Sequence, residues 1–244
     1  MKVFIAVHDR APTPSARYLT RVQVGAALGE RQTGCVHDDD GDNISARNPL
    51  YAELTALYWL WKNVEDDVVG LCHYRRYFSP IMAPSEPVLT ARRDDVQGLV
   101  SLDPAGVLFA QETAIAELIV PRPVVCTGSL EDQYISHHGR PQDWHAMLAA
   151  LALVHPNEAR DARGFFTQSN ALTQYNMLIG RRDVVRAYCA WLFPVLAEVE
   201  RVLNPQVHPM QHRALGFLGE RLFSWWLESR NPRRVHRPVL FINE

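Results

Sequence analysis

Residues 68–78 read Val-Val-Gly-Leu-Cys-His-Tyr-Arg-Arg-Tyr-Phe, a short apolar run that leads directly into a cationic and aromatic cluster. The apolar part predicts a strand that is buried on both faces. In an open α/β sheet, ligands bind outside the carboxyl ends of such strands. Two adjacent guanidinium groups, Arg75 and Arg76, match phosphate oxygens in a two-pronged geometry. The stretch therefore predicts a phosphate-binding site at a sheet edge, with a solvated surface loop as the alternative.

The composition is that of an ordinary globular protein. Of the 244 residues, 47% are apolar and 21% are charged, which suits one domain or two tightly joined lobes. Lys and Arg number 25 against 27 Asp and Glu, so no global basic field exists to attract nucleic acid or an anionic membrane. A basic cluster at residues 230–237 could contact acidic lipid headgroups, although a solvated tail segment is the expected role.

The cysteines and apolar runs bear on the compartment. The 4 cysteines are widely scattered and form no C-x-x-C pair, which argues against a zinc site or a disulfide scaffold. The apolar run at residues 3–7 is too short for the core of a signal peptide. No apolar run reaches the roughly 18 residues that a membrane-spanning helix needs. We therefore expect a reduced, cytoplasmic protein.

Hydrophobic periodicity predicts alternating strands and helices. Strands are expected at residues 3–7, 68–72, 107–109, 118–120 and 175–180. Helices are expected at residues 50–62, 92–100, 132–138, 142–154, 183–203 and 212–228. The helix at 183–203 should break or kink at Pro194, and residues 164–173 should form a loop. This alternation indicates an α/β sandwich.

The helix predicted at residues 50–62 carries a buried acid. Asn48-Pro49 opens this helix, because Asn is a good N-cap and Pro is favoured at the first helical position. Apolar residues cover almost every side of the helix, so it should be buried. Glu53 lies within it, and an unpaired buried carboxylate is costly. We expect Glu53 either to pair with an arginine or to face a ligand.

Common catalytic fingerprints are missing from the sequence. It contains no G-x-G-x-x-G or G-x-x-x-x-G-K-[ST] loop for phosphates, and neither G-x-S-x-G nor H-E-x-x-H. An acidic loop with Asp38, Asp40 and Asp42 could bind a divalent ion through carboxylate oxygens, with a solvated turn as the alternative. His137 and His138 are adjacent on a predicted helix and point in different directions, so they are a weak metal signal.

Glu220 is a candidate general base. Its predicted helix is otherwise apolar, and such surroundings raise the pKa of a carboxyl group toward neutrality. The alternative is an ordinary helix-surface carboxylate that pairs with Arg221 or Arg213.

Several blocks of the sequence resemble one bacterial family. Residues 41–45 (Gly-Asp-Asn-Ile-Ser), 48–49 (Asn-Pro), 51–63 (Tyr-Ala-Glu-Leu-Thr-Ala-Leu-Tyr-Trp-Leu-Trp-Lys-Asn) and 70–78 (Gly-Leu-Cys-His-Tyr-Arg-Arg-Tyr-Phe) are similar to the capsular and exopolysaccharide glycosyltransferases catalogued as domain of unknown function 4422. The similarity continues at residues 3–8, 22–26, 175–177, 188–193 and 216–222. Family members often carry Cys where this chain has Ala52, a position that we expect to serve packing.

The resemblance implies a fold and an activity. The fold would be a single GT-A-like α/β/α sandwich with a mixed central sheet over residues 1–244, with a nucleotide-sugar half at 1–110 and an acceptor half at 111–244. Members resemble enzymes that transfer a hexose, in some cases galactofuranose, from a UDP-sugar to a glycan or lipid-linked acceptor in capsule, exopolysaccharide or O-antigen biosynthesis. Such an enzyme would be cytoplasmic, peripheral at the inner membrane, and without a nucleic-acid partner.

The resemblance also suggests roles for individual residues. Many GT-A transferases hold a metal through Asp-x-Asp at the end of an equivalent strand, where this chain has His-Tyr-Arg-Arg. We expect Arg75 and Arg76 to neutralise the departing diphosphate, without a tightly bound cofactor. The rival assignment is Mn or Mg at Asp38, Asp40 and Asp42. The residues expected at the donor are His8, Gly25, Asp42, Asn43, Glu53, Lys62, His73, Tyr74, Arg75 and Arg76.

On the acceptor side, the expected residues are His137, Asn176 and Arg221, with Glu220 as the base if the enzyme inverts. Two alternatives come from other classes. One is a non-catalytic nucleotide- or glycan-binding module of a polysaccharide assembly complex. The other is a metal-dependent phosphohydrolase that uses the acidic loop.

Overall fold

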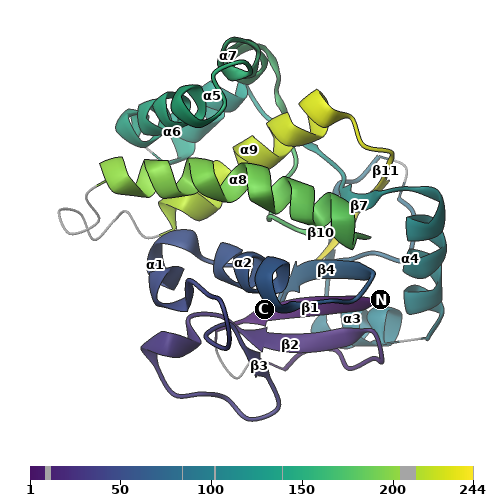
Figure 1. Ribbon diagram of the computed structural model, residues 1–244. Coiled ribbons are helices and arrows are strands. Elements are labelled where there is room, and N and C mark those ends of the chain that lie inside the picture. The colour runs from purple at the N-terminus through teal and green to yellow at the C-terminus, as the bar shows by residue number, and fades with distance from the viewer. Residues whose placement is uncertain (9–11, 84, 102, 139, 204–212, 244) are drawn as a thin grey trace.

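The chain folds around a large mixed β-sheet (Figure 1). The computed structural model describes residues 1–8, 12–83, 85–101, 103–138, 140–203 and 213–243. Ten strands of these residues form one sheet, whose main path is β11–β7–β10–β4–β1–β2–β3. The strands of this path are β1 (Lys2–Val7), β2 (Leu19–Gln23), β3 (Val36–His37), β4 (Val68–His73), β7 (Leu118–Pro121), β10 (Leu178–Arg181) and β11 (Arg234–Arg237). The others are β5 (Arg76–Phe78), β6 (Val88–Ala91) and β12 (Val239–Ile242).

The pairing of β1 with β4 determines where the carboxyl ends of the strands lie. These two strands are parallel, and their register aligns Ala6 with His73. The segments that follow β1 and β4 therefore emerge at the same edge of the sheet. Strand β2 is also parallel to β1, whereas β10 runs antiparallel to β4. The predicted mixed central sheet is confirmed.

Helices cover both faces of the sheet (Figure 1). Helices α2 (Leu54–Asn63), α8 (Arg182–Val202) and α9 (Ala214–Arg230) lie over one face, and α3 (Arg93–Val100) and α4 (Asp103–Ile115) over the other. A further group packs beyond α8 and α9, and consists of α5 (Leu130–His138), α6 (Pro141–Val154) and α7 (Ala159–Gln168). The predicted α/β sandwich is confirmed.

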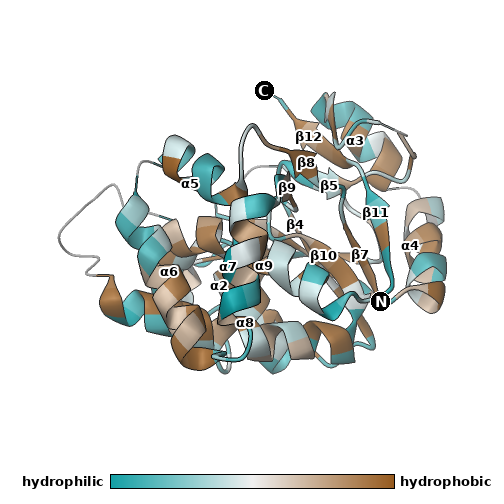
Figure 2. Ribbon diagram, turned by 90° about the horizontal axis from the view of Figure 1, so that it is seen from above, coloured by the Kyte–Doolittle hydropathy of each residue, from teal (hydrophilic) through white to brown (hydrophobic). Residues whose placement is uncertain are grey.

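Alternate side chains of β1 contribute to two separate cores. Phe4 and Ala6 belong to the cluster that includes α2, α8 and α9, whereas Val3, Ile5 and Val7 belong to the cluster with α3 and α4. This follows from strand geometry, because successive side chains point to opposite faces. Figure 2 shows the apolar strands β7 and β10 beside helices of mixed hydropathy.

Two predictions of secondary structure are wrong, and in both segments buried residues four positions apart indicate a helix. Residues 107–109, predicted as a strand, lie within α4, where Ala105 and Phe109 are four residues apart and both buried. The first half of the loop predicted at 164–173 belongs to α7, where Ala162 and Phe166 show the same spacing and burial. Positions i and i+4 share one face of a helix, and these faces are apolar.

The basic segment at residues 230–237 is part of the sheet rather than a solvated tail. Strand β11 pairs in parallel with β7, and the Arg237 side chain, 5% exposed, forms an ion pair with Glu112 of α4. Arg230 pairs with Glu158 at 2.5 Å. Arg230 and Arg237 therefore form ion pairs within the protein. In α8, the helix continues through Pro194, and the predicted break is absent from that element.

Among the described residues, no helix combines the length and the apolar character that crossing a membrane requires.

Two glycines offer a matched test of the packing between β4 and β10. A Cβ atom at Gly70 would lie 2.8 Å from Ile179 Cγ1 and 2.9 Å from the carbonyl oxygen of Leu178. We expect Gly70→Ala to lower the free energy of unfolding by about 1–3 kcal/mol, because the neighbouring strand must move. Exposed Gly98 in α3 has open space, so Gly98→Ala should raise it by about 0.5–1 kcal/mol. Urea unfolding measures both, and equal effects would contradict the argument.

Candidate functional site

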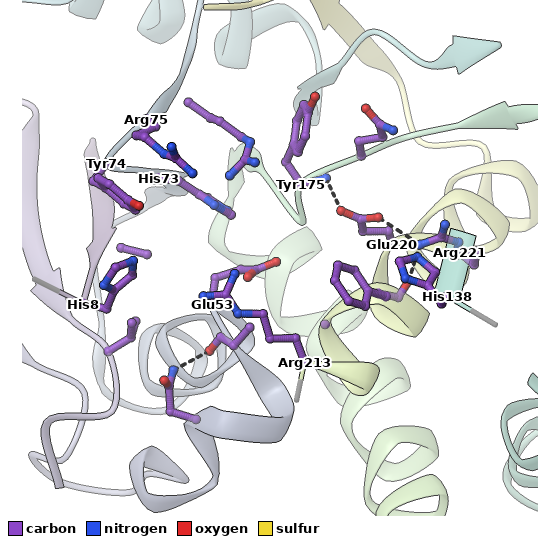
Figure 3. A pocket seen from close by; sticks show the side chains of 18 of the residues that line it. His8, Glu53, His73, Tyr74, Arg75, His138, Tyr175, Arg213, Glu220 and Arg221 are labelled. Carbon is purple, nitrogen blue, oxygen red and sulfur yellow. Dashed lines mark hydrogen bonds and ion pairs between the residues drawn. The ribbon is translucent and has the colours of Figure 1, made fainter. Parts of the chain in front are cut away.

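A cavity of about 360 Å³ lies at the carboxyl ends of β1 and β4 (Figure 3). That volume is in the usual range for small-molecule sites. Both predicted halves of the chain contribute to its walls. The lining residues are Ala6, His8, Val24, Asn48, Ala52, Glu53, His73, Tyr74, Arg75, Arg76, Gln133, His137, His138, Gln174, Tyr175, Arg213, Gly216, Phe217, Glu220 and Arg221.

One end of the cavity is cationic because of the hairpin between β4 and β5. His73 pairs with Arg76 across this hairpin, so Tyr74 and Arg75 form its two-residue turn. The His8 ring, just after β1, meets the Tyr74 ring edge-on with centroids 4.9 Å apart. The turn thus carries both arginines to the sheet edge that the sequence predicted.

The two arginines keep their charges available to the cavity. The Arg76 guanidinium lies 4.6 Å from the centre of the Tyr175 ring and 5.2 Å from that of Phe241. The Arg75 guanidinium lies 5.3 Å from the Tyr74 ring. In the described part of the chain, neither arginine forms an ion pair, and both Nε atoms are buried without a hydrogen-bond partner. Aromatic rings therefore hold these guanidinium groups without neutralising them.

His73 lies behind the arginines as a neutral group. Its side chain is buried, and its Nε2 atom has no hydrogen-bond partner among the described residues. Burial lowers the pKa of His73, and the nearby Arg76 lowers it further, while Glu53 acts in the opposite direction. The unprotonated ring leaves one nitrogen available to a ligand.

The helix predicted at residues 50–62 is interrupted, and Glu53 lines the cavity from the break between the two shorter helices. Helix α1 (Asn48–Tyr51) ends at Ala52, which has φ 50° and ψ −131°, and α2 starts at Leu54. Asn48 is not the N-cap but lies in the first turn, and its Nδ2 donates to the carbonyl oxygen of Ala52 at 2.8 Å. Ala52 lines the cavity as well as packing, and its positive φ is strained for a residue with a Cβ atom.

A second strained segment joins the two acidic residues of the cavity. Tyr175 and Asn176, predicted to begin a strand, form a turn with φ 76° and 49° ahead of β10. The Tyr175 amide donates to Glu220 Oε1 at 2.7 Å. The Asn176 Nδ2 atom donates to Glu53 Oε1 at 2.6 Å and to the carbonyl oxygen of Gly216 at 2.9 Å. Asn176 is 2% exposed and does not line the cavity, so these contacts replace the predicted contact with a sugar.

Glu220 and Arg221 follow each other on α9 and differ in access to the cavity. Burial raises the pKa of Glu220 to about 7, against the opposing effects of Arg221 and the Tyr175 amide. The Arg221 side chain is 1% exposed and donates to Glu220 Oε2 at 3.0 Å, to the Phe217 carbonyl oxygen at 2.8 Å and to Gln133 Oε1. Arg221 thus ties α9 to α5, although it was predicted to bind the acceptor.

The carboxylates of the acidic loop are not among the groups that line the cavity, and they already have partners in the protein. Asp38 is fully buried and accepts hydrogen bonds from the Gly25 and Ala26 amides at 3.0 and 3.1 Å. Asp40 pairs with Arg31 at 2.8 Å. No cluster of three or more His, Cys, Asp or Glu side chains suited to a metal occurs in the described residues. These contacts disfavour the rival metal assignment.

The structure separates the predicted donor residues into two groups. His8, Glu53, His73, Tyr74, Arg75 and Arg76 line the cavity, and so do His137 and Arg221 from the predicted acceptor set. Gly25, Asp42, Asn43 and Lys62 do not line it. Asp42 and Lys62 instead lie 3.7 Å apart in a surface ion pair, and Asn43 donates to the Gly41 carbonyl oxygen within its own loop.

Several lining residues escaped the sequence analysis as site candidates. They are Gln133, His138, Gln174, Tyr175, Arg213 and Phe217. Phe217 precedes Glu220 by three residues, so helical spacing alone could have placed both on one face. Arg213, exposed and with φ 72°, is the N-cap of α9, and no local pattern indicated it.

The model of a family described as a domain of unknown function, DUF4422, matches residues 2–231. The chain belongs to this family. Its fold is similar to the apo structure of WbbM, a bifunctional glycosyltransferase, with a TM-score of 0.85 and 22% identity. The match covers 100% of this chain and 45% of that chain, so this DUF4422 chain spans less than half of WbbM. A comparison with curated proteins finds no match.

We expect the amide of Asn176 to matter more for stability than its left-handed backbone. Asn176→Ala leaves Glu53 and the Gly216 carbonyl without their donor, and each lost buried hydrogen bond costs about 1–3 kcal/mol. Asn231, with φ 42° at the C-cap of α9, is the matched control, because Asn231→Ala changes mainly the backbone preference, by about 1 kcal/mol. Urea unfolding should show the larger loss for Asn176→Ala. Equal losses would show that the amide contacts contribute little.

Proposed function

We propose that this chain is a glycosyltransferase that moves a hexose from a UDP-sugar to a glycan or lipid-linked acceptor. The observation that carries the proposal is a pair of unneutralised guanidinium groups, Arg75 and Arg76, across one cavity from Glu220. Capsular polysaccharide, exopolysaccharide or O-antigen would be the product, made in the cytoplasm or at the cytoplasmic face of the inner membrane. The family assignment and the similarity of fold to WbbM support the proposal.

The cationic end would receive the diphosphate of the donor. Guanidinium groups suit phosphate oxygens, and Arg75 and Arg76 are held in place by aromatic rings instead of carboxylates. Negative charge grows on the diphosphate as its bond to the sugar breaks. Fixed positive charge at that point lowers the barrier by several kcal/mol in comparable sites, about 3 kcal/mol for a single well-placed donor.

Glu220 would accept the proton of the acceptor hydroxyl. In an inverting displacement, the acceptor oxygen forms a bond to the anomeric carbon while the bond to the diphosphate breaks, and its electron pair leaves with UDP. A base works best when its pKa lies near the operating pH, as burial arranges for Glu220. Each carboxylate oxygen of Glu220 accepts one hydrogen bond from the protein, which leaves a second lone pair for the substrate.

We propose that the arginines, rather than a divalent metal at the acidic loop, neutralise the diphosphate. The carboxylates of Asp38 and Asp40 bond to backbone amides and to Arg31, and neither residue lines the cavity. The same contacts weigh against a metal-dependent phosphohydrolase at this loop. A non-catalytic binding module would use the same cavity, and it is distinguished by binding UDP without forming product.

The diphosphate assignment is tested by neutralising both arginines. Arg75→Gln/Arg76→Gln should weaken UDP binding by about 100-fold or more, because the variant loses at least one hydrogen bond between charged groups at each arginine and each such bond contributes about 1.5–3 kcal/mol. Arg201→Gln on the exposed end of α8 is the control and should bind UDP like the wild type. Titration calorimetry measures binding, and product formation from a panel of labelled UDP-sugars is assayed in excess chelator. Complete loss of turnover that added metal restores would overturn the metal-free assignment.

The pH dependence of turnover tests the base. Because a general base acts when deprotonated and the pKa of Glu220 is about 7, kcat should rise as the pH increases toward about 7 and level off above it. Glu220→Gln keeps an acceptor for the Tyr175 amide but cannot take a proton. It should abolish transfer while UDP still binds. A variant with normal turnover, or a wild-type profile without this rise, would remove Glu220 from the mechanism.

A further inference from the structure

The two ends of the cavity differ in chemistry. Figure 3 shows His8, Tyr74 and Arg75 on one side of the cavity and Glu220, Arg221 and His138 on the opposite side. The second end is built from α5 and α9, which Arg221 holds together through Gln133. It therefore has its own rigid walls.

Aromatic rings fix His138 at this end. The His138 ring stacks on Phe217 of α9, with ring centroids 4.1 Å apart and an angle of 23° between the planes. It also lies against Tyr134, with centroids 4.9 Å apart. Both His138 and Phe217 line the cavity. Rotation of the imidazole is thereby restricted, so its edge has a fixed direction.

The ring nitrogens of His138 differ from those of its neighbour His137 in their contacts with the described residues. Neither nitrogen has a hydrogen bond to another described residue, whereas the neighbouring His137 uses Nδ1 for contacts with the Gln133 carbonyl oxygen at 3.1 Å and the Ser136 hydroxyl at 3.2 Å. An imidazole in its neutral form offers one donor and one acceptor. A sugar hydroxyl both donates and accepts, so it complements either nitrogen.

The cationic side chains packed against His138 are already bonded or neutral, whereas Arg213, which also lines the cavity from the start of α9, lies close enough to His73 to lower its pKa. The Arg221 guanidinium is buried and already bonded to Glu220, Phe217 and Gln133. Burial lowers the pKa of His138 to about 4, and Arg221 and His137 lower it further, so the ring is neutral near pH 7. The carboxyl group of Glu220 lies at the same end and, once ionised, would repel a second carboxylate. An acidic sugar is therefore disfavoured here.

We propose that the α5–α9 end of the cavity is the acceptor subsite, and that it takes an uncharged sugar ring held by the Phe217 ring and the edge of His138. This inference rests on the proposed glycosyltransferase function. The C–H face of a sugar is apolar and packs on an aromatic ring, while its hydroxyls bond to imidazole nitrogens. Phe217 and Glu220 share one face of α9, so a sugar on Phe217 has a hydroxyl beside the proposed base.

Binding of simple glycosides in the presence of UDP tests the proposal. The probes are octyl glycosides of glucose and galactose and, as the acidic counterpart, octyl glucuronide, with binding followed by saturation-transfer NMR and calorimetry. A neutral glycoside should bind the wild type at least about tenfold more tightly than the glucuronide. His138→Ala and Phe217→Ala should each weaken neutral-glycoside binding about tenfold or more and leave the Kd for UDP within about twofold.

The controls separate a lost subsite from a lost fold. His145→Ala, at an exposed position on α6, should bind glycoside and UDP like the wild type. Phe217→Leu keeps apolar bulk without a stacking ring, so it should fold, bind UDP and still lose glycoside affinity. UDP binding by each variant reports that the cationic end is intact.

The outcomes distinguish this inference from the proposed function. If wild type binds UDP but none of the glycosides, or binds octyl glucuronide as tightly as the neutral probes, the subsite assignment is overturned and the donor assignment stands. Unchanged glycoside affinity in both His138→Ala and Phe217→Leu overturns it as well. If wild type fails to bind UDP, the proposed function fails first.

Discussion

The amide group of Asn176 connects parts of the chain that lie far apart in the sequence. It donates to Glu53 at the junction of α1 and α2 and to the Gly216 carbonyl oxygen of α9, while the adjacent Tyr175 amide donates to Glu220. The two turn residues adopt positive φ, a conformation that costs a residue with a Cβ atom about 1–3 kcal/mol. Buried hydrogen bonds offset this cost. In return, both carboxyl groups of the cavity are held by one short, rigid turn.

Strain is concentrated around the cavity. Of the non-glycine residues described with positive φ, Ala52, Tyr175 and Arg213 line the cavity and Asn176 lies directly behind its wall. Such conformations persist only where the surrounding structure enforces them, and they gather at functional sites. The break at Ala52 turns Glu53 toward the cavity, which a continuous helix would direct elsewhere.

Some of the buried polar atoms without hydrogen-bond partners also lie at the cavity, and others lie elsewhere in the described chain. His73 Nε2 and the Nε atoms of Arg75, Arg76 and Arg221 are buried without hydrogen-bond partners among the described residues. Buried polar groups without partners are uncommon because each costs free energy in the absence of a ligand. At the cationic end, phosphate oxygens would complete these bonds. At the α5–α9 end, where the guanidinium is already bonded, a polyol suits the remaining imidazole edge better than an anion.

The sequence alone determined the strands β1 and β4, the helical layers and the cationic hairpin at the sheet edge. These features depend on residues close together in the chain: short apolar runs, helical spacing, and arginines directly after a strand. It also identified Glu220 from the apolar character of its own helix. The predictions were wrong at α4 and α7. In α4 a run of large apolar residues resembled a strand, and in α7 a polar segment resembled a loop, although both contain buried residues at i and i+4.

Only the tertiary structure decided which of the charged residues meet. Asp42 and Lys62 form an ion pair on the surface. Arg221 of α9 donates a hydrogen bond to Gln133 of α5. Asn176 donates one to Glu53, more than a hundred residues away in the sequence. The left-handed conformations at Ala52 and Tyr175 have no local signal, because neither residue favours them. They are imposed by hydrogen bonds and packing between distant segments, which come into existence only when the chain has folded.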